Sequence, residues 1–185
     1  HSDNIITAVE RASKVVFALK SYAHYDHSGE MAASSITDGI DVVLTLYHNK
    51  LKHGVDVIKH YEPVPPVKCY FDELNQVWTN LIHNVIQAMD GHGAFEISVS
   101  SIPCPSQKGA ESGSCVVVKI TDSGCGIPPE IQGRIFEPFF TTKPAGEGSG
   151  LGLDICRKII DKHQGKIDFE SKTGRTTFRV WLPIR

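Results

Sequence analysis

Four short segments of the 185-residue chain combine residue types that can hold a charged ligand, namely residues 80–84, 122–127, 136–143 and 148–152. Around the last segment, glycines stand at positions 146, 148, 150 and 152, just ahead of a helical pattern. Glycine lets the backbone come close to an anion, and the N-terminus of a helix attracts phosphate. A flexible loop can show the same spacing. No Gly-Lys-Ser/Thr follows, so the segment is not a Walker loop, and it lacks the acidic residue of a dinucleotide fingerprint.

Asp122 adds an independent element at the end of a predicted strand. Side chains alternate between the two faces of a strand, so Val116, Val118, Ile120 and Asp122 share one face. Because the first three are apolar, we expect that face to be buried and Asp122 to point inward. A buried carboxylate needs a hydrogen-bond donor, and the exocyclic amine of adenine is one. The glycines that follow leave room for a flat ring.

Asn84 and Lys143 supply groups suited to a metal ion and to phosphate. Helical spacing places Asn80 and Asn84 one turn apart on one face of a predicted helix. Mg²⁺ prefers oxygen ligands, and an amide oxygen adds no negative charge beside a polyphosphate. Lys143 can offset phosphate charge. Taken singly, Asn84 could only bridge within the helix and Lys143 could be a solvated lysine, but four segments in this order favour a nucleotide site.

In this order the segments resemble the N box, the Asp-Gly-x-Gly box, the Phe box and the Gly-Leu-Gly box of sensor histidine kinases. The matching stretches begin at Asn80-Leu-Ile-His-Asn84, Asp122-Ser-Gly-Cys-Gly126, Phe136-Glu-Pro-Phe-Phe and Gly148-Ser-Gly-Leu-Gly152. That ATP-binding domain belongs to the wider superfamily of gyrase, Hsp90 and MutL ATPases with the Bergerat fold (GHKL). The resemblance covers residues 35–185, and residues 136–153 are similar to kinases of the nitrogen-regulation sensor group.

The resemblance implies a role for each matching residue. Asn84 would bind Mg²⁺ with Asn80 close by, and both would be catalytic together with Lys143. Asp122 would bind the adenine amine. The other residues that the resemblance places around ATP are Gly124, Gly126, Ile127, Phe136, Phe139, Phe140, Gly148, Ser149, Gly150, Leu151 and Gly152. Of these, the three phenylalanines would anchor the ATP lid, and residues 148–152 would meet the phosphates together with Lys143.

Asn80 also bears on the reaction. Gyrase-like ATPases have a water-activating glutamate at this position, and an amide cannot act as a general base. We therefore expect a catalytic fragment of a cytoplasmic histidine kinase. It would pass the γ-phosphoryl group of Mg-ATP to a histidine on a dimerisation helix missing upstream, for relay to a response-regulator receiver domain. His1, His24, His27 and His83 are interpreted as non-acceptors, so the fragment would not phosphorylate itself.

Three alternatives stay open. One is an ATP-driven conformational switch of the Hsp90 or MutL kind, against which Asn80 argues. Another is a degenerate kinase that serves only as a dimeric scaffold, against which the intact motifs argue. The third is a serine kinase with the same fold, which the dimerisation-type first helix makes a weaker hypothesis.

The first segment predicts a long helix over residues 4–24. Ile5, Val9, Ala12, Val16, Leu19 and Ala23 recur with a mean spacing of about 3.5 residues, which is typical of a helix packed in a bundle. By resemblance it is the second helix of a dimerisation and phosphotransfer hairpin. We expect two domains, residues 1–30 with this partial hairpin and residues 35–185 with the catalytic domain, and a homodimer formed through the helix.

Further elements must position the four segments. The periodicity predicts helices at 37–51, 72–89 and 151–162, a short helix after Pro129, and strands at 55–61, 95–99, 115–122, 166–170 and 176–182. These elements contain too few βαβ units for a doubly wound sheet. The sequence therefore predicts an α+β fold, a two-layer sandwich with helices on one face of a mixed sheet.

Composition removes several classes of protein. Nineteen basic and 21 acidic residues give a net charge of −2, which disfavours a nucleic-acid partner. The apolar runs are too short to span a bilayer. Five cysteines without a CxxC pair predict reduced thiols and argue against a zinc site or a disulfide framework. His24 and His27 form an HxxH that no carboxylate or cysteine motif completes, so we interpret them as surface histidines.

Overall fold

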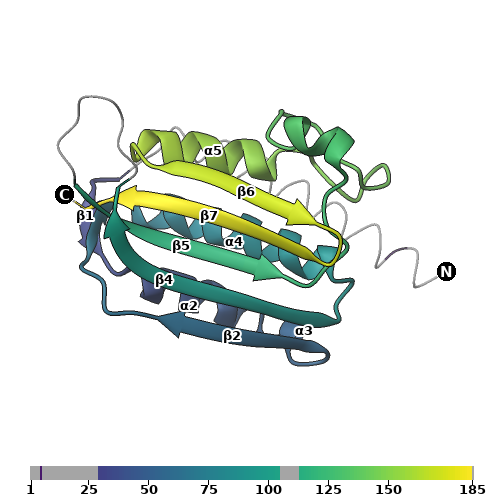
Figure 1. Cartoon of the computed structure of the whole chain (residues 1–185), viewed down its shortest axis with the longest axis horizontal. Coiled ribbons are helices and arrows are strands. Elements are labelled where there is room, and N and C mark those ends of the chain that lie inside the picture. The colour runs from purple at the N-terminus through teal and green to yellow at the C-terminus, as the bar shows by residue number, and fades with distance from the viewer. Residues whose placement is uncertain (1–4, 6–28, 105–112, 185) are drawn as a thin grey trace.

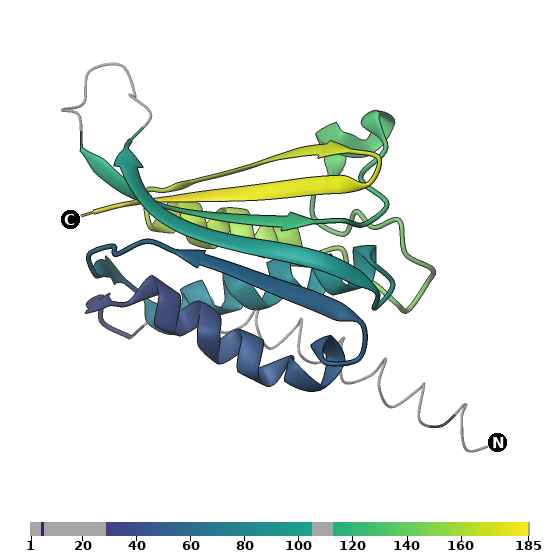
Figure 2. The ribbon, with the colours of Figure 1, turned by 60° about the horizontal axis from the view of Figure 1, so that its bottom comes forward.

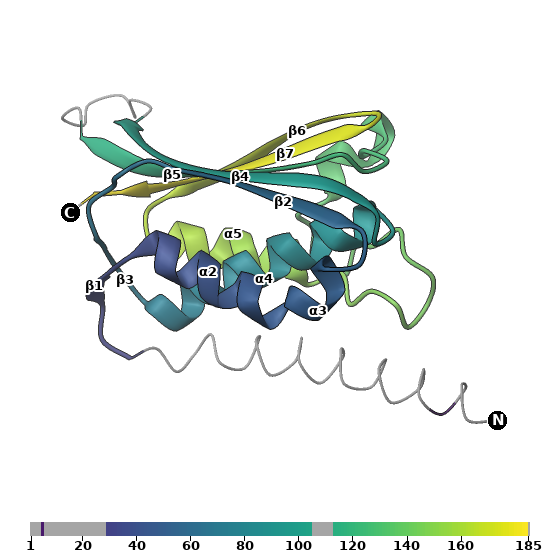
Figure 3. The ribbon, with the colours of Figure 1, turned by 90° about the horizontal axis from the view of Figure 1, so that it is seen from below.

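The computed structural model describes residue 5, residues 29–104 and residues 113–184. In this part of the chain a five-stranded mixed sheet forms one layer, and helices cover one of its faces (Figure 1, Figure 3). The predicted α+β class, with helices on one face of a mixed sheet, is therefore confirmed. The helix predicted over residues 4–24 lies outside the described residues, apart from Ile5.

The sheet consists of five strands, in the spatial order β2 (Val55–Tyr61), β4 (Gly93–Pro103), β5 (Ser114–Asp122), β7 (Arg175–Pro183) and β6 (Lys166–Lys172). β2 and β4 are parallel, and all other neighbours are antiparallel. The parallel pair requires a long connection, which includes a helix packed below the sheet. A second, two-stranded sheet pairs β1 (Ala32–Ser34) with β3 (Val67–Cys69), both of which the sequence analysis missed.

The helical layer contains α2 (Ile36–Leu46), α3 (His48–Leu51), α4 (Phe71–Ala88) and α5 (Gly152–Lys162), and a 3₁₀ helix, η1 (Pro129–Arg134), follows β5. The single helix predicted over residues 37–51 is wrong, because the chain leaves the helical path at Tyr47 (ψ 2°) and divides it into α2 and α3. Ser35 caps α2, since its hydroxyl accepts a hydrogen bond from the Asp38 N–H at 3.3 Å.

The core lies between α4 and the inner face of the sheet. Trp78, Leu81 and Ile82 of α4 are each 1% exposed or less, and so are Ile97 of β4 and Ile120 of β5. These positions recur at helical spacing on α4 and at every second residue on the strands, which is the pattern of a one-sided sheet. Their burial fixes the rotation of α4 about its axis and so determines which of its residues face away from the sheet.

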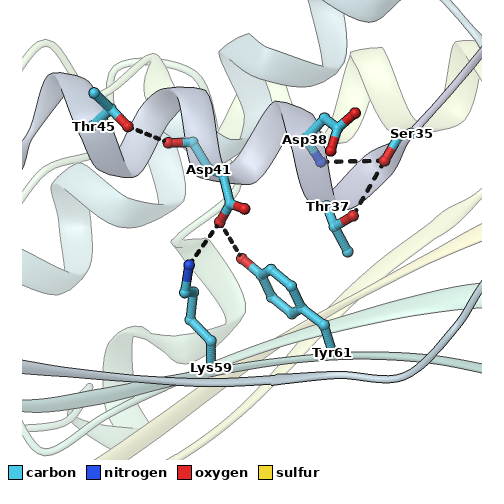
Figure 4. Close-up of polar contacts among 7 residues, drawn as sticks. All are labelled: Ser35, Thr37, Asp38, Asp41, Thr45, Lys59 and Tyr61. Atoms are coloured by element: carbon cyan, nitrogen blue, oxygen red, sulfur yellow. Dashed lines mark hydrogen bonds and ion pairs between the residues drawn. The ribbon is translucent and has the colours of Figure 1, made fainter.

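A polar contact fixes α2 against the edge strand β2, beside which it lies (Figure 2). The Asp41 carboxylate accepts hydrogen bonds from the Tyr61 hydroxyl at 2.9 Å and from Lys59 Nζ at 3.1 Å (Figure 4). Burial, and then the hydrogen bond and the charge of Asp41, raise the pKa of Tyr61, so its hydroxyl stays a donor. The contact attaches the middle of α2, which leads on to Tyr47, to the edge of the sheet.

A disulfide joins Cys104, just after β4, to Cys115 of β5. The prediction that all five cysteines are reduced thiols is wrong for this pair, whereas Cys69, Cys125 and Cys156 are free. The antiparallel register explains the pairing, because it places Ile102 opposite Cys115 and brings the two cysteine Cα atoms to 5.0 Å. A count of cysteines and their spacing carries no information on such a register.

In the part of the chain that the structure describes, none of the helices combines the length and apolar character that crossing a bilayer requires.

Candidate functional site

A cavity of about 690 Å³ lies between α4, the end of β5 and the segment that leads into α5. Of the residues predicted to bind a ligand, these line it: Asn80, Asn84, Asp122, Gly126, Ile127, Phe140, Lys143, Gly148, Ser149, Gly150 and Gly152. All four motif segments therefore contribute to one cavity, although they come from a helix, a strand end and two loops.

Asp122 forms the closed end of the cavity. As its strand parity predicted, the side chain is buried, with 3% exposed. The Gly124 N–H donates a hydrogen bond to its Oδ1 at 2.8 Å. Burial raises the pKa of Asp122, and the hydrogen bond from Gly124 opposes that rise. Thr176, the cross-strand partner of Asp122 on β7, is also buried and lines the same end.

Gly124 does not line the cavity, but its place beside α4 requires glycine. A Cβ atom there would lie 2.6 Å from the Ala88 carbonyl oxygen, which real Cβ contacts do not reach. The absence of a side chain lets the loop after β5 pack directly on the C-terminal end of α4. Gly126 has φ 81° and lines the cavity next to Ile127.

The face of α4 that points away from the core provides the floor of the cavity. Asn80 joins α4 to the start of α5, because its Oδ1 accepts from Gln76 Nε2 at 2.9 Å and its Nδ2 donates to the Gly152 carbonyl at 3.1 Å. Asn84 lies one turn further along, as predicted. Gln87 follows on the same face and accepts a hydrogen bond from Lys143 Nζ. This contact ties the loop that carries Lys143 to α4.

The phenylalanines of the third segment have three different environments. Phe140 lines the cavity, with the Arg134 guanidinium 4.6 Å from its ring centre. Phe136 is buried in the core under Arg157. Phe139 has φ 64° and is 74% exposed. The structure therefore brings only Phe140 of the three to the cavity.

The glycine-rich loop lines the other end of the cavity. Gly150 has φ 69°, and a Cβ atom there would lie 2.3 Å from the Phe139 carbonyl carbon. Only glycine allows these two backbone segments to approach so closely. Leu151, which does not line the cavity, precedes α5, and α5 begins at Gly152 without a hydrogen bond from a capping side chain. The N–H groups in the first turn of α5 therefore lie next to the glycine-rich loop.

Several residues that line the cavity do not belong to the four predicted segments. Gln87 follows Asn80 and Asn84 at helical spacing, so that periodicity could have found it. Thr176 depends on the pairing of β5 with β7, which no local pattern reveals. Tyr47 and Lys50 line the cavity because α2 packs on α4 and Tyr47, which follows α2, contacts His83.

Comparison with known proteins shows to which family the chain belongs. Residues 70–185 match the profile described as histidine kinase-, DNA gyrase B-, and HSP90-like ATPase. The sensory histidine kinase/phosphatase NtrB of Proteus hauseri is 30% identical over 187 residues, which cover 96% of this chain and 51% of that protein. The sensor histidine kinase ZraS of Escherichia coli (strain K12) is 39% identical over 124 residues, 66% of this chain and 24% of that protein. The chain thus spans about half the length of its NtrB relatives.

Solved structures agree with the sequence matches. The catalytic domain of histidine kinase ThkA is 32% identical and superposes with a TM-score of 0.70 over 84% of this chain and 96% of that chain. The Acinetobacter baumannii histidine kinase AdeS superposes with a TM-score of 0.73 over 99% of this chain and 83% of that chain. At 22% identity, the AdeS match shows a shared fold alone.

The matched residues 70–185 contain all four segments that meet at the cavity. The chain therefore belongs to the family of histidine kinase-, DNA gyrase B- and HSP90-like ATPases, and it carries the catalytic ATPase domain of the sensor histidine kinase type.

Proposed function

We propose that this chain binds Mg-ATP and transfers the γ-phosphoryl group to a histidine on a dimerisation helix, from which a response-regulator receiver domain takes it. The observation that carries the proposal is one cavity with Asp122 at its closed end and Asn84, Lys143 and the glycine-rich loop at the other. The named relatives support the kinase reaction, because they are sensor histidine kinases.

Asp122 is suited to select adenine. Its Oδ1 accepts from the Gly124 N–H, and its second oxygen can accept from the exocyclic amine of the base. Ile127 and Phe140 line the cavity as well and offer apolar surface to the ring. Guanine carries a carbonyl in place of that amine, so the carboxylate would repel it.

Asn84 is suited to hold Mg²⁺. Among the described residues, no group of three or more His, Cys, Asp or Glu side chains is arranged to bind a metal ion. This fits an ion that keeps its waters and phosphate oxygens and takes a neutral ligand from the protein. The Asn84 amide on the rigid α4 offers such an oxygen at the cavity floor. When bound, Mg²⁺ would offset the charge of the phosphates.

Asn80 favours a protein acceptor over water. Both ends of its amide are engaged, one by Gln76 and one by the Gly152 carbonyl, and an amide does not remove a proton from water. A histidine acceptor attacks with its own nitrogen lone pair and needs no base at this position.

Lys143 would contact the phosphates from the loop, and the glycines at 148, 150 and 152 would let backbone N–H groups approach them.

Titration calorimetry with ATP and Mg²⁺ tests the binding site. We expect Asn84→Ala and Gly150→Ala each to weaken ATP binding about tenfold or more, the first through the metal and the second by displacing the loop from Phe139. Asn49→Ala, on an exposed position of α3, is the matched control and should bind like the wild type. Wild-type affinity in both site variants would contradict the site assignment.

Labelling with γ-phosphate-labelled ATP tests the reaction. We expect acid-labile phosphate on a separately supplied dimerisation helix with its histidine, and none when that histidine is replaced by glutamine. Steady release of phosphate without labelling of a protein would instead support the ATP-driven switch, and failure of the chain to bind any nucleotide would support the scaffold.

A further inference from the structure

One wall of the cavity is formed by the corner between α2 and α3, which belongs to none of the four motif segments. Tyr47 is the residue between these helices and Lys50 lies in α3, and both line the cavity together with His83 of α4. We call these three residues the corner wall. The corner wall meets α4 at His83, which lies one turn before Gln87, the residue that binds the loop of Lys143.

The contacts within the corner wall hold its side chains together. The Tyr47 hydroxyl lies 3.4 Å from His83 Nδ1, and the Lys50 ammonium lies 5.7 Å from the centre of the Tyr47 ring. Burial raises the pKa of Tyr47, so the phenol stays neutral and can donate to the histidine. The ring of Tyr47 therefore connects a cation on α3 to the residue that directly precedes Asn84.

The corner wall also has a stable base. Tyr47 follows directly on α2, which Asp41 attaches to β2 through Tyr61 and Lys59 (Figure 4). On the other side of the corner, Leu51 of α3 is buried in the core, with 6% exposed. The backbone that carries Lys50 is therefore fixed on both sides.

The charges around the phosphate end define what the corner wall can bind. Among the described residues that line the cavity, Lys50 and Lys143 are the lysines, and they come from different elements, α3 and the loop ahead of the glycine-rich segment. The acidic residues of this lining are Asp122, at the base end, and Glu147, in the loop of Lys143. Lys50 therefore adds a second cation to the cavity from outside the four motif segments, and a cation is suited to the phosphate that carries the most charge. In ATP the γ-phosphoryl group carries more charge than the inner ones, and ADP lacks it.

We propose that Lys50, supported by Tyr47 and His83, contacts the γ-phosphoryl group and makes the cavity distinguish ATP from ADP. The inference rests on the proposed function, because it requires an adenine nucleotide with its base at Asp122. It assigns Lys50 as a binding residue and Tyr47 as a positioning residue that acts through it.

The test compares the affinities of ATP and ADP, each with Mg²⁺, by titration calorimetry. Lys50→Met keeps an unbranched side chain one atom shorter and removes the charge. We expect it to weaken ATP binding about fivefold to tenfold and to leave ADP binding within about twofold, as the loss of one charged contact predicts. Lys52→Met, on an exposed lysine of the same turn that does not line the cavity, should change neither affinity.

A second variant separates the ring from the charge. Tyr47→Leu removes both the hydroxyl and the ring under Lys50, so we expect the ratio of ATP to ADP affinity to fall as it does in Lys50→Met. Thermal unfolding of each variant controls for a change in the fold. The inference is overturned if the ratio of ATP to ADP affinity keeps its wild-type value in Lys50→Met, or if it falls as far in Lys52→Met as in Lys50→Met. Either result leaves the proposed function standing. A wild-type chain that binds neither nucleotide overturns the proposed function, and the inference with it.

Discussion

The two ends of the cavity are built from different kinds of structure. Asp122 and Thr176 at the closed end are cross-strand partners in the sheet and are 3% and 4% exposed. The opposite end is formed by the loop of Lys143, by the glycine-rich segment before α5 and by exposed Lys50. The pairing of β5 with β7 fixes the closed end, whereas side chains and loop backbone from outside the sheet form the open end.

This difference predicts how substitutions divide between the ends. A change at the closed end should weaken every adenine ligand alike, because all of them share the base. A change at the open end should act only on ligands that carry phosphate. Affinities for adenosine, ADP and ATP measured side by side therefore test the comparison.

The largest effect is expected from Asp122→Asn. The amide can still accept from the Gly124 N–H, but its NH₂ group would then face the amine of the base, donor against donor. We expect the affinities for adenosine, ADP and ATP all to fall about 100-fold in calorimetry. Asp56→Asn, on an exposed position of β2, is the control. A loss confined to ATP would contradict the division between the ends.

A second test strains the closed end without removing a polar group. In Gly124→Ala the new methyl group would meet the Ala88 carbonyl, which belongs to α4 and cannot move aside alone. We expect the free energy of unfolding in guanidinium chloride to fall by about 1–3 kcal/mol, as other overpacked sites do. Gly133→Ala has open space around the new methyl group and should leave stability within about 0.5 kcal/mol.

Lys143→Met tests the open end and should have a smaller effect. Lys143 is held by Gln87 on α4, so its ammonium is already directed to the cavity floor. We expect the affinity for ATP to fall about fivefold to tenfold, while that for adenosine stays unchanged. Gln87→Ala, which keeps the charge but removes its anchor, should give a smaller loss of ATP affinity. Equal losses for adenosine and ATP would show that Lys143 supports the fold instead.

The smallest effect on the cavity is expected from His163, which ends α5 far from the glycine loop. Its Nε2 accepts from the Tyr70 N–H at 3.0 Å and its Nδ1 lies 2.7 Å from the Ile159 carbonyl, so the neutral ring fits between α4 and α5. Burial lowers the pKa of His163, opposed by the Ile159 hydrogen bond and by Glu73, while Lys162 lowers it further.

The sign of the pH dependence follows from that direction. Because the folded pKa lies below the unfolded value of 6.5, the unfolded chain takes up the proton first, and stability falls as the pH drops below 6.5. We expect the free energy of unfolding to fall between pH 8 and pH 5.5, and to fall further in the wild type than in His163→Gln. Chemical denaturation at the two pH values measures both changes. The affinity for ATP at pH 8 should be the same in the wild type and the variant.

The parts of the fold that the sequence predicts are those that depend on local periodicity. The stripe of α4 and the alternation of β5 follow from burial on one face, and they place Asn84 and Asp122 correctly. The end of α2 at Tyr47 cannot be read from the periodicity, because the apolar pattern continues across it into α3. The three-residue strands β1 and β3 are too short for a pattern, and the pairing of Cys104 with Cys115 depends on register alone.

At the site, the motifs predict which segments meet, but not how each side chain lies. Phe136, Phe139 and Phe140 differ in burial within five residues because η1 and the loop after it turn the chain sharply, and φ 64° at Phe139 directs that ring to solvent. Thr176 and the corner wall come from elements distant in the chain. Their place in the cavity follows from tertiary packing.

The uncovered face of the sheet bears on how sequences of this family can diverge. The described helices lie on one face of the sheet and leave the other face uncovered (Figure 3). Glu96, Ser98, Lys119, Thr121 and Thr177 line a polar depression on β4, β5 and β7, and they alternate with buried positions such as Ile97 and Ile120. Substitutions there leave the core and the cavity untouched. Related chains should therefore vary at every second position of these strands and keep the residues in between. In an alignment, the rate of substitution along each strand would alternate from one residue to the next.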